Sequence, residues 1–316
     1  MPGSFRALSA RLGQDPLQVQ GPGGNTSIKF DQVMWIKASG TKLADASQDD
    51  IFVPVDLPKA RAEAYGKGDG SCNDTVIDPT CGLRPSIETT FHAVLPGKVV
   101  AHTHSIATLT HVISPEGQRA AMEKLTGLPF VMVPYAKPGI PLTQMILDRS
   151  NKATRIIVLQ NHGLIVMGDT VTEVSDILSE VESRLMMPVL RGAKRVPVDA
   201  APRGYHWAPE SWIAQDETVT KKALGGSYYP DHVVFLGAAM PVNETSDDAP
   251  ASLYKGQGIA LRDGATPSQR AMLRCLHDVL SRVPATWELQ PIGVQAEAEL
   301  LNWDAEKYRQ ALDERG

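Results

Sequence analysis

Residues 99–105 have the sequence Val-Val-Ala-His-Thr-His-Ser, an apolar run that ends in two histidines separated by a single residue. A short apolar run of this kind is typical of a buried β-strand. On a strand, side chains two residues apart point to the same face, so the rings of His102 and His104 are expected to lie side by side. Such a pair suits two ligands of one metal ion, although hydrogen-bonded structural histidines can show the same spacing.

A third histidine, His162, lies in the turn-like segment 161–163 between two expected strands at 156–160 and 164–167. Three neutral imidazoles with an open fourth position form a usual catalytic zinc arrangement. The remaining histidines lack such a pairing and are expected to be structural, with His92 and His232 as the first candidates for an exception. The three histidines are therefore a candidate metal site, with hydrogen-bonded structural histidines as the alternative.

Glu88 is the first candidate among the carboxylates, because its expected helix leads directly into the strand that carries His102. Ser86 is a plausible N-cap for a helix that runs through Phe91 to Leu95, which places Glu88 in its first turn, just ahead of the strand that carries His102. Near a divalent cation a glutamate can act as a ligand or transfer a proton. The alternative is that Glu88 only interacts favourably with the helix dipole.

Two stretches rich in small residues precede Glu88. The first is Gln-Gly-Pro-Gly-Gly-Asn-Thr-Ser at 20–27, and the second is Ser-Gly-Thr at 39–41. Turns of this composition expose backbone N–H groups that can hold a phosphate or a similar oxyanion, although most such turns are simply loops. Neither stretch matches the nucleotide-binding patterns GxxxxGK or GxGxxG.

Strands and helices are expected to mix throughout the chain, which indicates an α/β fold. Further strands are expected at 26–30, 33–37, 51–55 and 130–133, and further helices at 105–113, 142–150 and 171–190. The polar stretch 58–83 is expected to be an exposed insertion with a short helix at 59–64.

Beyond residue 197 the sequence becomes rich in Pro, Gly and Trp. We expect a strand at 233–236 and helices at 268–283 and 296–313. A domain boundary is placed near residue 245, which gives a catalytic domain at 1–245 and a mainly helical extension at 246–316.

The composition limits the possible partners. The chain has 316 residues, of which 42% are hydrophobic, so it can form a large core. Its net charge is −5, so a nucleic-acid or anionic-membrane partner is not expected. No apolar run approaches the roughly 18 residues that span a bilayer, and the first residues do not resemble a secretory leader. A cytoplasmic protein is therefore expected, with Cys72, Cys81 and Cys275 as reduced thiols.

Taken together and in order, five motifs resemble the class II aldolase/adducin family. They are GGNTSI at 23–28, IKASGTKL at 36–43, RPSIETTFHAVLP at 84–96, VVAHTHS at 99–105 and LQNHGLIVMG at 159–168. Within that family the chain most resembles the aldolase portion of bifunctional rhamnulose-1-phosphate aldolase/dehydrogenase proteins. The segments that carry this finer resemblance include VPYAKPG at 133–139, YYPDHVVFLG at 228–237 and LLNWDAEKY at 300–308.

The resemblance implies roles for the candidate residues. His102, His104 and His162 would be metal ligands, for Zn²⁺ or alternatively Mn²⁺, Co²⁺ or Fe²⁺, and Glu88 would be the acid/base that can also coordinate the metal. The substrate phosphate would be held by Asn25, Ser39, Gly40 and Ser86. The sequence departs from fuculose-phosphate aldolases in having Ile87 where they have a second serine before the glutamate.

The resemblance also implies a fold and an activity. The expected fold has three layers, αβα, with a central, largely antiparallel sheet, and it assembles as a homotetramer. The expected activity is reversible cleavage of a ketose or ketose 1-phosphate, a small-molecule sugar substrate, through a metal-bound enediolate. The alternatives are an epimerase, decarboxylase or dehydratase that uses the same site, or a non-catalytic, adducin-like binding protein.

Overall fold

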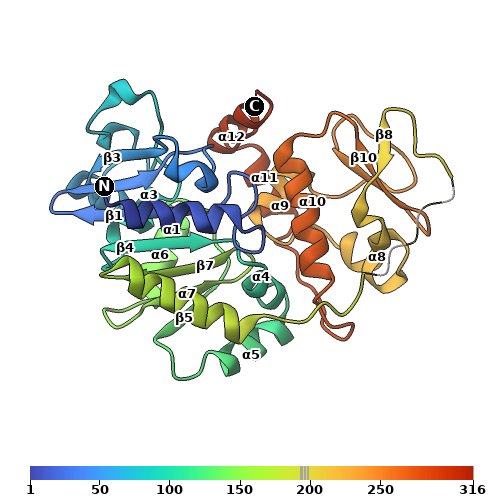
Figure 1. The fold of residues 1–316 in the computed structure, drawn as a ribbon, viewed down its shortest axis with the longest axis horizontal. Helices are drawn as coiled ribbons and strands as arrows, with labels where there is room; N and C mark the ends of the chain where they lie inside the picture. Colours follow the sequence, from blue (N-terminus) through green and yellow to red (C-terminus); the bar gives the residue numbers. More distant parts are fainter. Residues whose placement is uncertain (193–194, 196, 198, 316) are drawn as a thin grey trace.

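A seven-stranded sheet forms the centre of the amino-terminal part of the protein, in the order β3-β2-β1-β4-β7-β6-β5 (Figure 1). The computed structural model describes residues 1–192, 195, 197 and 199–315. The strands are β1 Asn25–Phe30, β2 Val33–Lys37, β3 Phe52–Asp56, β4 Val99–Thr103, β5 Phe130–Val133, β6 Ile156–Leu159 and β7 Gly163–Gly168. Among these described strands only β5 and β6 pair in parallel, which confirms the expected, largely antiparallel sheet.

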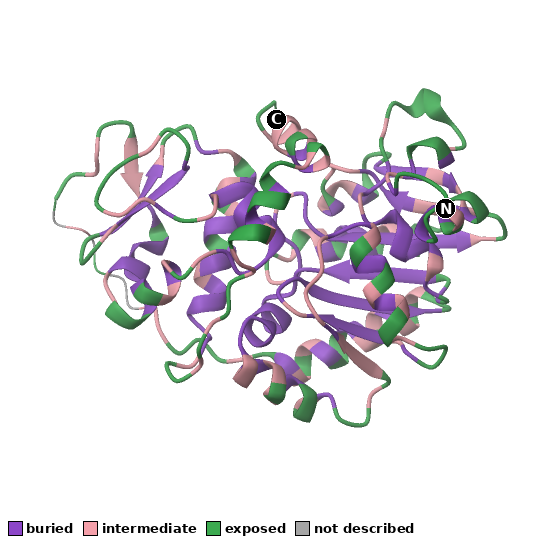
Figure 2. Ribbon diagram, turned by 180° about the vertical axis from the view of Figure 1, so that it is seen from behind, coloured by how far each residue is buried: buried purple, intermediate pink, exposed green. Residues whose placement is uncertain are grey.

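Apolar side chains alternate between the two faces of this sheet, and helices cover both. In β4, Val99 and Ala101 belong to one core cluster and Val100 to another. The first cluster is covered by α1 Gly3–Gln14, α4 Ile106–Val112 and α7 Val171–Leu185, and α5 Pro115–Lys124 packs beside α4. The opposite face is covered by α2 Leu57–Ala64, α3 Thr89–Val94 and α6 Ile140–Arg149. Figure 2 shows the buried strands between these helices, so the three-layer arrangement is confirmed.

Among the helix boundaries that differ from the prediction, those of α3 and α7 have a clear physical cause. Helix α3 begins at Thr89, one residue beyond Glu88, because the Ser86 carbonyl accepts from Thr89 N at 3.0 Å and the Ser86 hydroxyl accepts from Glu88 N at 3.2 Å. Glu88 is therefore the N-cap residue and not part of the first turn. Helix α7 ends at Leu185 instead of residue 190, since Pro188 disfavours helical backbone immediately before it.

The expected insertion at 58–83 contains the predicted short helix, α2, followed by a mostly exposed stretch with two 3₁₀ turns, η2 Asn73–Thr75 and η3 Pro79–Cys81. Cys72 is buried within it, and its backbone N–H donates to Glu63 Oε2 at 3.0 Å. Cys72, Cys81 and Cys275 are all free thiols.

The carboxyl-terminal part adds a three-stranded sheet and several helices. The sheet has the order β8-β10-β9, with β8 Tyr205–Trp207, β9 Ala251–Tyr254 and β10 Gly258–Arg262. The helices are η4 Pro209–Ala214, α8 Glu217–Ala223, α9 Pro230–Leu236, α10 Pro267–Leu280, α11 Val294–Leu301 and α12 Asp304–Asp313. Because β8 pairs with β10, residues on both sides of position 245 share one sheet, and the expected domain boundary there stays a prediction.

The expected strand at 233–236 is wrong, because these residues belong to helix α9. A short, fully buried apolar run does not distinguish a strand from a helix, and Pro230 suits the first position of a helix. The single helix expected at 296–313 is divided into α11 and α12, because α11 ends at its C-cap, Asn302, and α12 begins two residues later.

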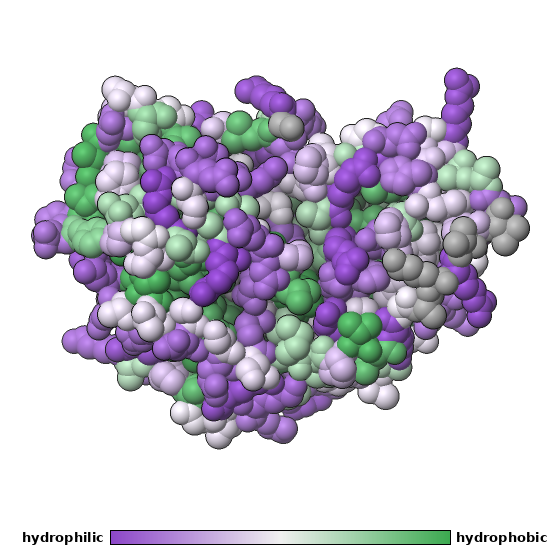
Figure 3. All heavy atoms as spheres, in the orientation of Figure 1, coloured by the Kyte–Doolittle hydropathy of each residue, from purple (hydrophilic) through white to green (hydrophobic). Residues whose placement is uncertain are grey.

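The surface is largely polar. On the face drawn in Figure 3, hydrophilic residues are distributed over both the amino-terminal and the carboxyl-terminal parts. Within the described ranges, we find no helix that combines the length and the apolar character needed to cross a bilayer.

Candidate metal centre

Three histidine rings converge at one end of the central sheet. His102 lies on β4, opposite Ile165 of β7, His104 follows the end of β4, and His162 lies in the turn between β6 and β7. The ring centroid of His102 is 4.9 Å from that of His104 and 4.9 Å from that of His162. One nitrogen of each ring lies within 4.8 Å of the other two, so the three side chains can share one cation.

The surroundings of His102 and His162 favour neutral imidazoles. Burial lowers the pKa of His102 and, more strongly, the pKa of His162. His102 Nδ1 donates to the Leu164 carbonyl at 3.0 Å, which leaves its Nε2 lone pair facing His104 Nε2 at 3.2 Å. Neutral imidazoles with converging Nε2 atoms are the donor set that a divalent metal ion requires.

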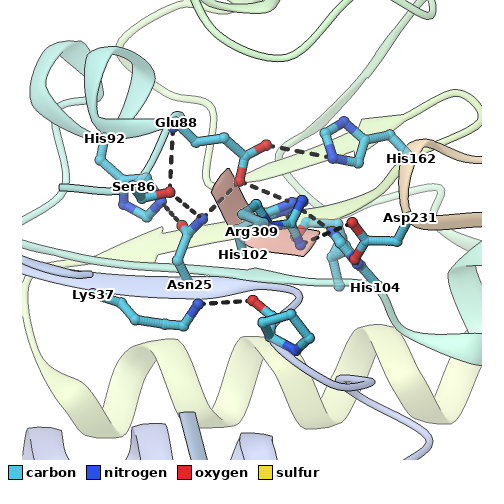
Figure 4. Close-up of polar contacts among 12 residues, drawn as sticks. Asn25, Lys37, Ser86, Glu88, His92, His102, His104, His162, Asp231 and Arg309 are labelled. Atoms are coloured by element: carbon cyan, nitrogen blue, oxygen red, sulfur yellow. Dashed lines mark hydrogen bonds and ion pairs between the residues drawn. The ribbon is translucent and has the colours of Figure 1, made fainter. Parts of the chain in front are cut away.

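The Glu88 carboxylate faces the same space from the opposite wall (Figure 4). Its Oε1 lies 3.4 Å from His162 Nε2, and its Oε2 lies 3.5 Å from His102 Nε2. Oε2 also accepts from Asn25 Nδ2 at 2.6 Å, whereas Oε1 is buried without a hydrogen-bond partner in the described part of the chain. One oxygen is thus held in place, and the other is available to a cation or a substrate, so the residues present fit a metal ion.

Asn25 is oriented by a hydrogen-bonded chain that the sequence did not reveal. His92 Nδ1 contacts the Ser27 hydroxyl at 2.7 Å, and His92 Nε2 contacts Asn25 Oδ1. Burial lowers the pKa of His92 well below its usual value, so the ring is neutral and can donate one hydrogen bond and accept the other. With its oxygen engaged by His92, the Asn25 amide group must direct its N–H bonds to Glu88 and Ser86.

The predicted phosphate-binding residues surround a cavity of about 30 Å³ next to the histidines. A bridge between Ala38 and Pro85 brings Ser39 close to Ser86. Gly40, with a φ of +78°, turns the chain beside α12, where an added Cβ would lie 2.3 Å from a Leu312 carbon. The structure brings the predicted site residues together around this cavity. Its lining includes Asn25, Ser39, Gly40, Ser86, Glu88, His104 and His162. His102 does not line the cavity, but its ring lies next to that of His104.

A second, larger cavity of about 520 Å³ lies next to the first. Ser39, Ile87 and Pro138 line both cavities. Ile87, the residue that departs from the fuculose-phosphate aldolase pattern, therefore lies at the junction between them.

The smaller of the two cavities is called the inner cavity. Four of its charged lining residues were not predicted: Lys37, Asp231, Glu306 and Arg309. Lys37 Nζ donates to the Pro22 carbonyl at 2.8 Å, and burial lowers the pKa of Lys37 to about 7. The others come from α9 and α12, which are remote in sequence from the histidines. Asp231 lies within the motif YYPDHVVFLG, Glu306 lies within LLNWDAEKY, and Arg309 follows that motif directly. These two motifs were the sequence signal from which the three residues could have been predicted.

Comparisons with known proteins identify the family. The family described as "Class II Aldolase and Adducin N-terminal domain" matches residues 7–188. The "Uncharacterized oxidoreductase YuxG" of Bacillus subtilis (strain 168) is 33% identical over 177 residues, which are 50% of this chain and 25% of that protein. This chain therefore matches only about a quarter of the length of that curated relative.

Two solved structures each resemble a little over half of the chain. The N-terminal class II aldolase domain of a conserved protein from Thermoplasma acidophilum is 29% identical, with a TM-score of 0.51, over 58% of this chain and 90% of that one. L-fuculose-1-phosphate aldolase from Thermus thermophilus is 15% identical, with a TM-score of 0.39, over 58% and 93% of the two chains. Since the family match extends over more than half of the sequence, from residue 7 to residue 188, this chain belongs to the class II aldolase/adducin family.

Proposed function

We propose that this protein is a metal-dependent aldehyde-lyase that reversibly cleaves a ketose or ketose 1-phosphate. The observation that carries the proposal is the approach of Glu88 to His102 and His162, two of the three clustered, buried imidazoles, with one carboxylate oxygen left without a hydrogen bond from the described residues. His102, His104 and His162 would hold the cation. When bound there, a divalent ion, Zn²⁺ as the first expectation, supplies a positive charge that stabilises negative charge developing on the substrate oxygens.

Glu88 would move the proton in this reaction. The Asn25 amide holds Oε2, so Oε1 is the atom that can take a proton from the substrate carbon or return it. The chain Ser27–His92–Asn25 fixes this arrangement, because each of its members is buried and hydrogen-bonded to the next.

The polar end of the inner cavity would hold the phosphate or another anionic group of the substrate. Hydroxyl groups of Ser39 and Ser86, the turn at Gly40 and the ammonium group of Lys37 line that end. A lysine whose pKa is lowered to about 7 by burial regains its charge most readily when an anion binds beside it.

The test compares the wild type with Glu88→Gln in a retro-aldol assay over a panel of ketoses and ketose 1-phosphates, with metal content measured in both. Glu63→Gln is the matched control, since Glu63 is a buried glutamate outside the cavity. We expect Glu88→Gln to keep its metal and lose activity by at least about 100-fold, the usual contribution of a positioned acid or base. Equal activity in Glu88→Gln and the wild type would contradict the assignment.

Product analysis in the same assay separates the related reactions. Epimerisation, decarboxylation or dehydration at the same site would give a product without cleavage of the aldol carbon–carbon bond. A non-catalytic, adducin-like protein would turn over none of the panel. The homotetramer stays a prediction that light scattering of the purified protein can check.

A further inference from the structure

The carboxyl-terminal part of the fold, which begins beyond residue 197, places a buried carboxylate against one of the three histidines. Asp231 Oδ2, from α9, lies 3.0 Å from His104 Nδ1. Both side chains are buried, with 2% of Asp231 and 6% of His104 exposed. Figure 4 shows Asp231 on the side of the His104 ring that faces away from Glu88.

The geometry of His104 distinguishes its two nitrogens. Its Nε2 faces His102 Nε2 at 3.2 Å, whereas its Nδ1 faces Asp231. An ionised carboxylate can only accept a hydrogen bond, so it favours the tautomer in which Nδ1 carries the proton. That tautomer leaves the Nε2 lone pair directed at the other two rings.

Asp231 is itself held by the last helix. Arg309, on α12, donates to Asp231 Oδ1 at 2.9 Å and to Glu306 Oε2 at 2.8 Å. The guanidinium of Arg309 thus pairs with the Asp231 carboxylate and fixes Oδ1. Oδ2, which is buried and has no other hydrogen-bond partner among the described residues, lies beside His104 Nδ1.

The glycine-rich loop closes over this pair from a third direction. An added Cβ at Gly23 would lie 2.6 Å from Asp231 Oδ2 and 2.9 Å from His104 Nδ1. The carboxyl-terminal part also holds the turn that carries His162, because Asn161 Nδ2 donates to the carbonyls of Tyr228 and Gln290 at 3.0 and 2.8 Å. Two separate ligand segments thus contact the carboxyl-terminal part.

We infer that Asp231 is a positioning residue for the metal ligand His104, so that the carboxyl-terminal part of the fold completes the metal centre within the same chain. This inference rests on the metal site of the proposed function. A carboxylate that accepts from the second nitrogen of a ligating histidine fixes the ring and raises its basicity, and removing such a group typically weakens metal binding about 10- to 100-fold.

The test measures the affinity of the full-length protein for Co²⁺ and Zn²⁺ by competition with a chromophoric chelator, together with the visible spectrum of the Co²⁺ form. The variant is Asp231→Asn, and the matched control is Asp278→Asn. Asp278 is buried like Asp231 and likewise accepts from arginine side chains, those of Arg274 and Arg282, but it lies outside the cavity at the histidines. We expect about 10- to 100-fold weaker binding and an altered Co²⁺ spectrum in Asp231→Asn, and neither change in Asp278→Asn.

The inference is overturned if Asp231→Asn binds both ions as the wild type does, with the same Co²⁺ spectrum. If the wild type binds no metal at all, both this inference and the proposed function fail, whereas unchanged binding in Asp231→Asn defeats this inference alone. Should Asp231→Asn not fold, nitrogen-15 NMR of the histidines in the zinc-loaded wild type decides the question. A His104 ring protonated at Nδ1 supports the inference, and a ring protonated at Nε2 overturns it.

Discussion

At the scale of single residues, the missing side chain of Gly23 leaves the room that Asp231 and His104 need to lie against each other. Its backbone does not have a positive φ, so alanine is conformationally acceptable there, but the added methyl group would meet Asp231 and His104 at less than 3.0 Å. We predict that Gly23→Ala weakens metal binding about tenfold, because the two side chains must separate. Gly264→Ala is the control, since an added Cβ there meets nothing within 4 Å. Chelator competition that gives equal affinities for Gly23→Ala and the wild type would refute the prediction.

The same scale shows what the sequence could reveal about the site. The spacing of His102 and His104 predicted two rings on one face of a strand, and these rings do lie together. The family resemblance supplied roles for Glu88, Asn25 and Ser86, which line one cavity. Asp231 and Arg309 escaped prediction because tertiary packing determines their partners, and the two residues themselves are 78 positions apart.

At the scale of elements, the strands of the central sheet were predicted better than the helices. All strands of that sheet were expected close to their observed positions, since each is an apolar run or alternation bounded by turn residues. Helix α5 was missed because it buries little more than Gly117 and Ala121 and so lacks an apolar stripe. The strands of the small sheet were missed because β8, for example, has only three residues, none fully buried. Helix α9 was mistaken for a strand because all of its residues are buried, which hides the helical period.

At the scale of the whole molecule, a buried lysine links stability to pH. Lys29 Nζ donates to the carbonyls of Leu95 and Gly97, and burial, with a smaller contribution from Arg61, lowers its pKa from 10.5 to about 7. Between pH 7 and 10.5 the unfolded chain binds more protons at Lys29 than the folded chain does, so the contribution of Lys29 to the free energy of unfolding rises with pH. Below pH 7 Lys29 is protonated in both the folded and the unfolded chain, so the full free-energy cost of burying its charge reduces the stability of the fold.

We therefore predict that the free energy of unfolding of the wild type, relative to Lys29→Met, increases with pH from about 7 to about 10, with a slope of up to about 1.4 kcal/mol per pH unit. Urea titrations at several pH values measure this difference. Lys67→Met, at an exposed position, serves as the control. A difference between the wild type and Lys29→Met that stays constant or falls over this range would show that Lys29 does not carry the effect.

The proposed function depends above all on His102, His104 and His162 binding one divalent ion beside Glu88. The most direct measurement is a crystal structure of the protein purified without chelators, with anomalous diffraction recorded on both sides of the absorption edge of the metal found by elemental analysis. We predict a single strong anomalous peak within bonding distance of Nε2 of all three histidines, near Glu88 Oε1. Protein without stoichiometric metal, or a peak that lies away from these rings, would contradict it.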